Sequence, residues 1–178
     1  QKQAEQPSIP SGRVAKYATS DAKDRMRNAL QTINAKLLSH GYKSKMLYDD
    51  NAMVDRAAAM RAGIGFYGKN SLIISRELGS TMLLGSVLTN ADLTITNHEK
   101  LEDSISGCGT CVKCIVKCPT NAILPEGTID VNLCLSWVAQ SPKDIPVELR
   151  KALGDKVYGC DECQDICPHN KIQIRRTN

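Results

Sequence analysis

The residues of this 178-residue chain whose types and spacing could do chemistry are its eight cysteines. Four of them lie close together, and Pro119 directly follows the last: Cys108, Cys111, Cys114 and Cys118. This C-x2-C-x2-C-x3-C-P spacing is the bacterial ferredoxin pattern, in which three thiolates of a tight loop bind one cluster and the fourth binds another. The spacing therefore predicts two iron–sulfur clusters rather than one.

A second cluster needs a reciprocal set of ligands. Cys160, Cys163 and Cys167, followed by Pro168, form the tail of the same motif without its first cysteine. Cys134 is the one cysteine left to complete the set. We therefore predict that one [4Fe–4S] cluster is held by Cys108, Cys111, Cys114 and Cys167, and the other by Cys118, Cys134, Cys160 and Cys163.

Zinc and disulfide bonds are the alternative uses of an even set of cysteines. Structural zinc favours paired C-x2-C motifs or cysteines with histidines, and none of His40, His98 and His169 lies at finger spacing. Disulfides are typical of small secreted domains. The sequence has no hydrophobic stretch of a secretory signal and no apolar run long enough for a membrane span. We expect a cytoplasmic protein with no membrane association.

The elements that must position these cysteines are read from hydrophobic periodicity. Apolar residues at helical spacing predict a helix over 20–41, which Ser20 can cap and Gly41 can end. A short strand is expected over 42–48 and an Ala-rich helix over 52–63. The apolar segments 71–75 and 80–89, separated by "RELG", predict a buried β-hairpin. The polar segment 92–106 is expected to be a linker.

The stretch "GIGFYG" at 63–68 matches the dinucleotide fingerprint GxGxxG. That fingerprint needs a strand before it and a helix after it, whereas the order predicted here is reversed. We therefore interpret these glycines as a helix end followed by an irregular loop. Gly65 and Gly68 could let the backbone approach a large flat ligand closely.

The net charge of +4 is unevenly distributed. Residues 1–45 contain nine Lys and Arg against three Asp and Glu. Such an excess permits a polyanionic partner, although a solvated helix face explains it equally well.

Several stretches together resemble one family. The segments "DDNAMVDRAAAMRAGIGFYGKNSLII", "GCGTCVKCIVKCPTNAI", "CLSW" and "VYGCDECQDICPHNK" occur in the order and near the spacing found in epoxyqueuosine reductases, which are cobalamin-dependent tRNA-modifying enzymes. The resemblance runs from about Arg13 to Lys171. It implies an α+β protein: a partial nitroreductase-like α/β cobalamin-binding catalytic domain at 1–100, expected to lack its N-terminal part, and a ferredoxin-like domain with two [4Fe–4S] clusters at 101–178.

The resemblance also implies a function. Family members are oxidoreductases that reduce epoxyqueuosine to queuosine at the wobble position of tRNA, using cobalamin that receives electrons through the two clusters. The implied partners are a tRNA anticodon stem-loop and an electron donor such as a flavodoxin or ferredoxin, and a monomer is expected. A ferredoxin-like electron-transfer protein and another cobalamin-dependent reductase, of the reductive dehalogenase type, remain alternatives.

Residue roles carried over from the family are as follows. Asp49 falls on the catalytic general acid, with Asp50 as the neighbouring rival, because opening an epoxide creates an alkoxide that needs a proton. The usual proline after this aspartate is replaced by Asn51-Ala52. The expected cobalamin contacts are Lys69, Asn70, Ser71, Ile73, Leu84, Ser136 and Asp161, for each of which ordinary packing is the alternative.

Overall fold

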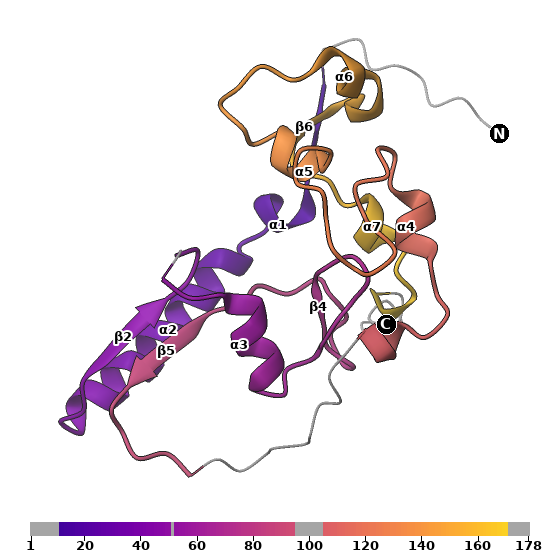
Figure 1. Ribbon diagram of the computed structural model, residues 1–178. Coiled ribbons are helices and arrows are strands. Elements are labelled where there is room, and N and C mark those ends of the chain that lie inside the picture. The colour runs from indigo at the N-terminus through magenta and orange to yellow at the C-terminus, as the bar shows by residue number, and fades with distance from the viewer. Residues whose placement is uncertain (1–10, 51, 95–104, 171–178) are drawn as a thin grey trace, which may run out of the picture.

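The computed structural model describes residues 11–50, 52–94 and 105–170 (Figure 1). Helices and short strands are mixed along this part of the chain, and the strands form three separate two-stranded sheets. The α+β character expected from the sequence is therefore confirmed. No helix among the described residues is both long enough and apolar enough to cross a membrane.

The first lobe is a helix packed on a two-stranded sheet. Helix α2 (Ala22–Ser39) covers strands β2 (Ser44–Leu47) and β5 (Ser86–Thr89), which pair antiparallel. Leu30 of the helix and Leu47 of the sheet are buried between them. The helix ends as predicted, because Gly41 adopts a φ of +81°, which non-glycine residues rarely take.

A second group of elements follows. Helix α3 (Asp55–Arg61) contacts the antiparallel pair β3 (Phe66–Tyr67) and β4 (Ile73–Ile74). Gly63 ends α3 with a φ of +75°, as interpreted from the sequence, but Phe66 and Tyr67 of the same glycine-rich stretch form strand β3 in place of the expected irregular loop. Gly65 is needed there, since a Cβ atom would lie 2.4 Å from the carbonyl oxygen of Ile74.

The predicted hairpin of 71–75 with 80–89 is wrong. The β4 strand pairs with β3, and β5 pairs with β2, so the two apolar segments have different partners. A single bridge between Ser75 and Gly79 closes the turn between them. The difference lies with β5, because all four of its residues pair with β2 and β4 pairs over only two residues with β3.

The cysteine-rich part consists of short helices. These are η1 (Ile105–Cys108), α4 (Lys113–Lys117), α5 (Leu135–Val138), α6 (Val147–Leu153), α7 (Glu162–Asp165) and η2 (Pro168–Asn170). Helix α6 lies in the segment between Cys134 and Cys160. It packs on α5 through a core of Leu135, Val138, Leu149 and Leu153.

The first described strand joins this cysteine-rich part rather than the lobe that follows it in sequence. Strand β1 (Arg13–Val14) pairs in parallel with β6 (Lys156–Tyr158), and helix α1 (Lys16–Thr19) comes directly after it (Figure 1). Arg13 also forms an exposed ion pair with Asp155 at 2.8 Å. Residues 13–16 therefore contact the predicted second domain, and the predicted boundary near residue 100 lies outside the described residues.

Candidate iron–sulfur and cofactor site

Four of the cysteines line a small cavity, termed site one. Cys108 ends η1, and Cys111 lies two residues before α4. Cys114 lies within α4, and Cys167 directly precedes η2. The other wall of this cavity contains Lys69, Asn70 and Ile74.

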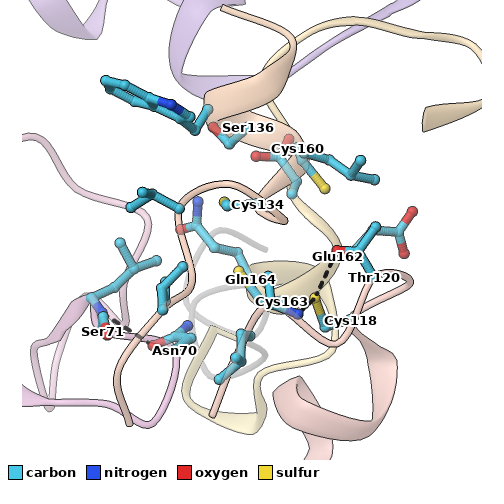
Figure 2. A pocket seen from close by; sticks show the side chains of 18 of the residues that line it. Asn70, Ser71, Cys118, Thr120, Cys134, Ser136, Cys160, Glu162, Cys163 and Gln164 are labelled. Atoms are coloured by element: carbon cyan, nitrogen blue, oxygen red, sulfur yellow. Dashed lines mark hydrogen bonds between the residues drawn. The ribbon is translucent and has the colours of Figure 1, made fainter. Parts of the chain in front are cut away.

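The other four cysteines line a second cavity, termed site two. Cys118 lies at the end of α4, Cys134 at the start of α5, Cys160 after β6 and Cys163 in α7 (Figure 2). Helices α4 and α7 are in contact, so the two sites are neighbours. The structure thus places the thiols in the same two sets of four that the motif spacing predicts.

All eight cysteines are free thiols, and seven of them are half-buried while Cys167 is buried. Within the described ranges, no three His, Cys, Asp or Glu side chains converge as they would on one metal ion. The cysteines of each set instead line one cavity together with other residues.

Burial dominates the electrostatics of the thiols. Burial, together with the charges of Cys160 and Cys134, raises the pKa of Cys163 to about 12. Burial also opposes ionisation of Cys118, but hydrogen bonds to the sulfur from Thr120 and Ala122 outweigh it and lower the pKa. Since thiolates are the metal ligands, iron binding at Cys163 must displace a proton that the site holds firmly.

The cavity of site two extends beyond the thiols to about 560 Å³. Of the expected cobalamin contacts, Asn70, Ser71, Ser136 and Asp161 line it. The hydroxyl of Ser71 donates to the carbonyl oxygen of Gly127, and its own carbonyl accepts a 2.7 Å hydrogen bond from Arg56. The carboxylate of Asp161 accepts a 2.8 Å hydrogen bond from the backbone amide of Lys16.

Three expected contacts lie elsewhere. Lys69 lines site one and donates a 2.8 Å hydrogen bond to the carbonyl oxygen of Gly109, in the loop between two cysteines. Ile73 is buried in the β3–β4 pair, and neither it nor Leu84 lines the site-two cavity. Leu72 supplies an apolar wall in their place.

Asp49 lies on an exposed loop after β2. Its side chain is 76% exposed and forms a 3.1 Å ion pair with Lys23 of α2. Its φ of +53° is a left-handed conformation, which Asp and Asn tolerate better than most residues. Asp49 does not line the cavity, but its charge acts on Tyr17, which does.

Sequence reasoning missed Tyr17, Arg56 and Trp137, which also line site two. Burial and a hydrogen bond to Tyr158 raise the pKa of Tyr17 to about 12, and the two rings lie 6.0 Å apart. Tyr17 reaches the cavity because β1 brings α1 to this part of the molecule. Its place depends on a pairing between distant segments, so no local signal could have revealed it.

Comparison with known proteins first shows which class of domain the cysteine-rich part belongs to. Residues 107–170, which include all eight cysteines, match the family model of the 4Fe-4S double cluster binding domain. The chain therefore carries an iron–sulfur domain of the double-cluster type.

Within that class the chain is similar to the epoxyqueuosine reductases, as three relatives illustrate. The epoxyqueuosine reductase of Lactococcus garvieae is 43% identical over 125 residues, which cover 70% of this chain and 34% of that protein. A crystal structure of epoxyqueuosine reductase with a tRNA-Tyr epoxyqueuosine-modified stem loop is 38% identical, with a TM-score of 0.75 over 83% of this chain and 38% of the other.

The third relative is the Bacillus subtilis epoxyqueuosine reductase, in a structure whose catalytic aspartate loop is swung out of the active site. It is 36% identical, with a TM-score of 0.73 over 83% of this chain and 38% of that one. The chain spans less than half the length of each of these three relatives.

Proposed function

We propose that this chain provides the cluster-binding and part of the catalytic machinery for reducing epoxyqueuosine to queuosine at the wobble position of tRNA. The single observation that carries the proposal is the site-two cavity. Four thiols at cluster-ligand spacing share this cavity with four side chains at family cofactor positions. A ferredoxin needs the thiols but not the wide cavity beside them.

Iron–sulfur ligation is the first part of the proposal. Cys108, Cys111, Cys114 and Cys167 hold one [4Fe–4S] cluster, and the site-two cysteines hold the other. Contact between α4 and α7 keeps the clusters close enough to pass electrons between them. An external donor such as a flavodoxin or ferredoxin supplies those electrons.

Cobalamin is the second part. The cavity of about 560 Å³ falls within the range of cofactor pockets and combines apolar walls, such as Leu72 and Trp137, with a few polar groups. Bound cobalamin would supply a low-valent cobalt centre as the immediate reductant. Asn70, Ser71, Ser136 and Asp161 are the residues proposed to contact it, within a nitroreductase-like catalytic domain that this chain covers only in part.

The chain's own residues must also manage protons. Removing the epoxide oxygen as water consumes two electrons and two protons. We assign one proton to the carboxyl group of Asp49, on the loop proposed to correspond to the catalytic aspartate loop of the Bacillus subtilis enzyme. The exposure of Asp49 fits a loop that lies away from its substrate, with Lys23 holding the carboxylate there.

The decisive experiment uses the protein reconstituted anaerobically with iron, sulfide and cobalamin. It should retain cobalamin through gel filtration and convert epoxyqueuosine-containing tRNA to queuosine-containing tRNA in the presence of a strong reductant. Two reducible clusters without cobalamin binding or turnover would instead identify a ferredoxin-like electron-transfer protein. Cobalamin binding with turnover of an organohalide, and none of the tRNA, would identify the dehalogenase type.

A further inference from the structure

Among the described residues, two buried side-chain atoms have no hydrogen-bond partner: Oδ1 of Asp55 and Nδ2 of Asn70. Asn70 is only 2% exposed, and its Nδ2 donates no hydrogen bond within the described part of the chain. Its Oδ1 accepts a 3.3 Å hydrogen bond from the backbone amide of Leu72, which fixes the orientation of the side chain. Figure 2 shows the amide nitrogen on the side of Asn70 that faces away from Ser71.

Leaving a buried donor unsatisfied is unfavourable, so native proteins nearly always give such a group a partner. The surroundings of Asn70 limit what that partner is. The side chain lies between the two cavities and lines both of them. In site one its neighbours include Cys108, Cys111, Cys114 and Cys167, in a cavity too small for a large organic cofactor. Sulfur atoms are therefore among the acceptors that site one offers to the amide.

Neighbouring contacts hold Asn70 against the cysteine loop. Lys69 is tied to the carbonyl oxygen of Gly109, between Cys108 and Cys111. Gly68 leaves the space that Asn70 occupies, because a Cβ atom on it would lie 2.7 Å from Oδ1 of Asn70. The short segment 68–70 therefore keeps the amide at the edge of site one.

We propose that Asn70 donates a hydrogen bond from Nδ2 to a sulfur atom of the site-one [4Fe–4S] cluster and thereby raises its reduction potential. This inference rests on the proposed ligation of site one and extends it with a tuning residue. Reduction adds negative charge to the cluster sulfurs, so a donor stabilises the reduced form more than the oxidised form.

The test compares three cluster-loaded, cobalamin-free proteins: the wild type, Asn70→Leu and Ser75→Ala. Ser75 is the matched control, because it is a buried polar residue only five positions after Asn70 that lines neither site. Its hydroxyl oxygen accepts hydrogen bonds from the backbone amides of Glu77 and Leu78. Potentials of both clusters are measured by titration followed with electron paramagnetic resonance.

We expect Asn70→Leu to make site one about tenfold harder to reduce, a downward shift of about 59 mV for a one-electron couple, with site two and the control unchanged. The wild type should also show an exchangeable proton coupled to the reduced site-one cluster. Asn70→Asp, which keeps the size and the acceptor for Leu72, should lose this coupling even if Asn70→Leu fails to load iron.

Other outcomes overturn the inference in distinguishable ways. A shift in site two alone would assign the amide to the other cavity. Unchanged potentials with the proton coupling intact would exclude a contact with either cluster. An effect that depends on added cobalamin would assign the amide to that cofactor, and a wild-type protein without two reducible clusters would overturn the ligand assignment as well.

Discussion

The proposed role of Asp49 as general acid can be tested with a single substitution. Its left-handed backbone is one that asparagine also tolerates, so Asp49→Asn should leave the loop conformation unchanged. The replacement removes the acid and, with it, the exposed ion pair with Lys23. In the protein loaded with both clusters and cobalamin, we expect turnover of epoxyqueuosine-containing tRNA to fall by about 10²- to 10⁴-fold, the usual contribution of a positioned general acid.

The neighbouring carboxylate provides the control for Asp49. Asp50 accepts a 2.8 Å hydrogen bond from the backbone amide of Ala52, and asparagine can accept the same bond. Asp50→Asn should therefore have a mild effect on turnover. The reverse order of effects would move the general acid by one residue, and wild-type rates in both variants would mean that the proton comes from elsewhere.

Cys118 tests the exchange of ligands between the two motifs. It lies four positions after Cys114 in the same motif yet lines site two. We expect Cys118→Ser to lower the iron content from about eight to about four per chain, with loss of the site-two cluster signal. Cys111→Ser should remove the site-one signal instead, and identical spectra from the two variants would contradict the assignment.

At the scale of elements, the β1–β6 pairing depends on close approach of two backbones. Gly159 has a φ of +74°, and a Cβ atom on it would lie 2.5 Å from the Cβ of Ala15. Gly159→Ala should therefore combine a backbone cost of about 1–2 kcal/mol with an overpacking cost of about 1–3 kcal/mol. Denaturant unfolding of the cluster-loaded protein measures the sum.

Gly41 is the matched control for Gly159. It has a φ of +81° but no heavy atom within 4 Å of an added Cβ. Gly41→Ala should carry the backbone cost alone. Equal losses of stability in the two variants would mean that Ala15, which follows β1, does not pack closely against Gly159.

These elements also show where sequence reasoning succeeds. Cysteine motifs are local, since a cluster fixes the spacing of ligands on one loop, and the two sets of thiols follow from counting. Helix α2 is set by its own periodicity and by Gly41. Strand pairing could not be predicted in the same way, because an apolar segment such as 71–75 indicates burial but not which strand it pairs with. The hairpin error and the missed Tyr17 both arise from such long-range pairing.

At the scale of the whole molecule, the basic excess of residues 1–45 is largely neutralised within the chain. Arg13, Lys16, Lys23, Arg25 and Arg27 all form exposed ion pairs with carboxylates. Such pairs contribute about 0–1 kcal/mol, so a phosphate can compete for them. Lys36, Lys43 and Lys45 have no carboxylate partner in the described part of the chain. The basic segment "KIQIRR" lies outside the described residues.

We predict that the three unpaired lysines contact tRNA phosphates. Three such contacts should weaken binding by about 20- to 40-fold between 50 and 200 mM salt. Replacing Lys36, Lys43 and Lys45 with alanine should remove most of this dependence, whereas Lys143→Ala with Lys151→Ala should preserve it. The test is tRNA binding measured by fluorescence anisotropy across salt concentrations. An unchanged salt dependence of the affinity in the triple variant would mean that these three lysines face solvent and do not contact the tRNA.

The β1–β6 pairing has a further consequence for how the protein is made. Arg13 and Asp155, which join these strands, lie 142 positions apart. At about 5–20 residues per second, a ribosome needs roughly 7–28 s to travel from one to the other. Throughout that interval β1 is a strand without its neighbour, and Asp161 has yet to receive the backbone amide of Lys16. The wall of site two is therefore completed only after Asp161 has been synthesised, so iron delivered sooner would meet an unfinished site.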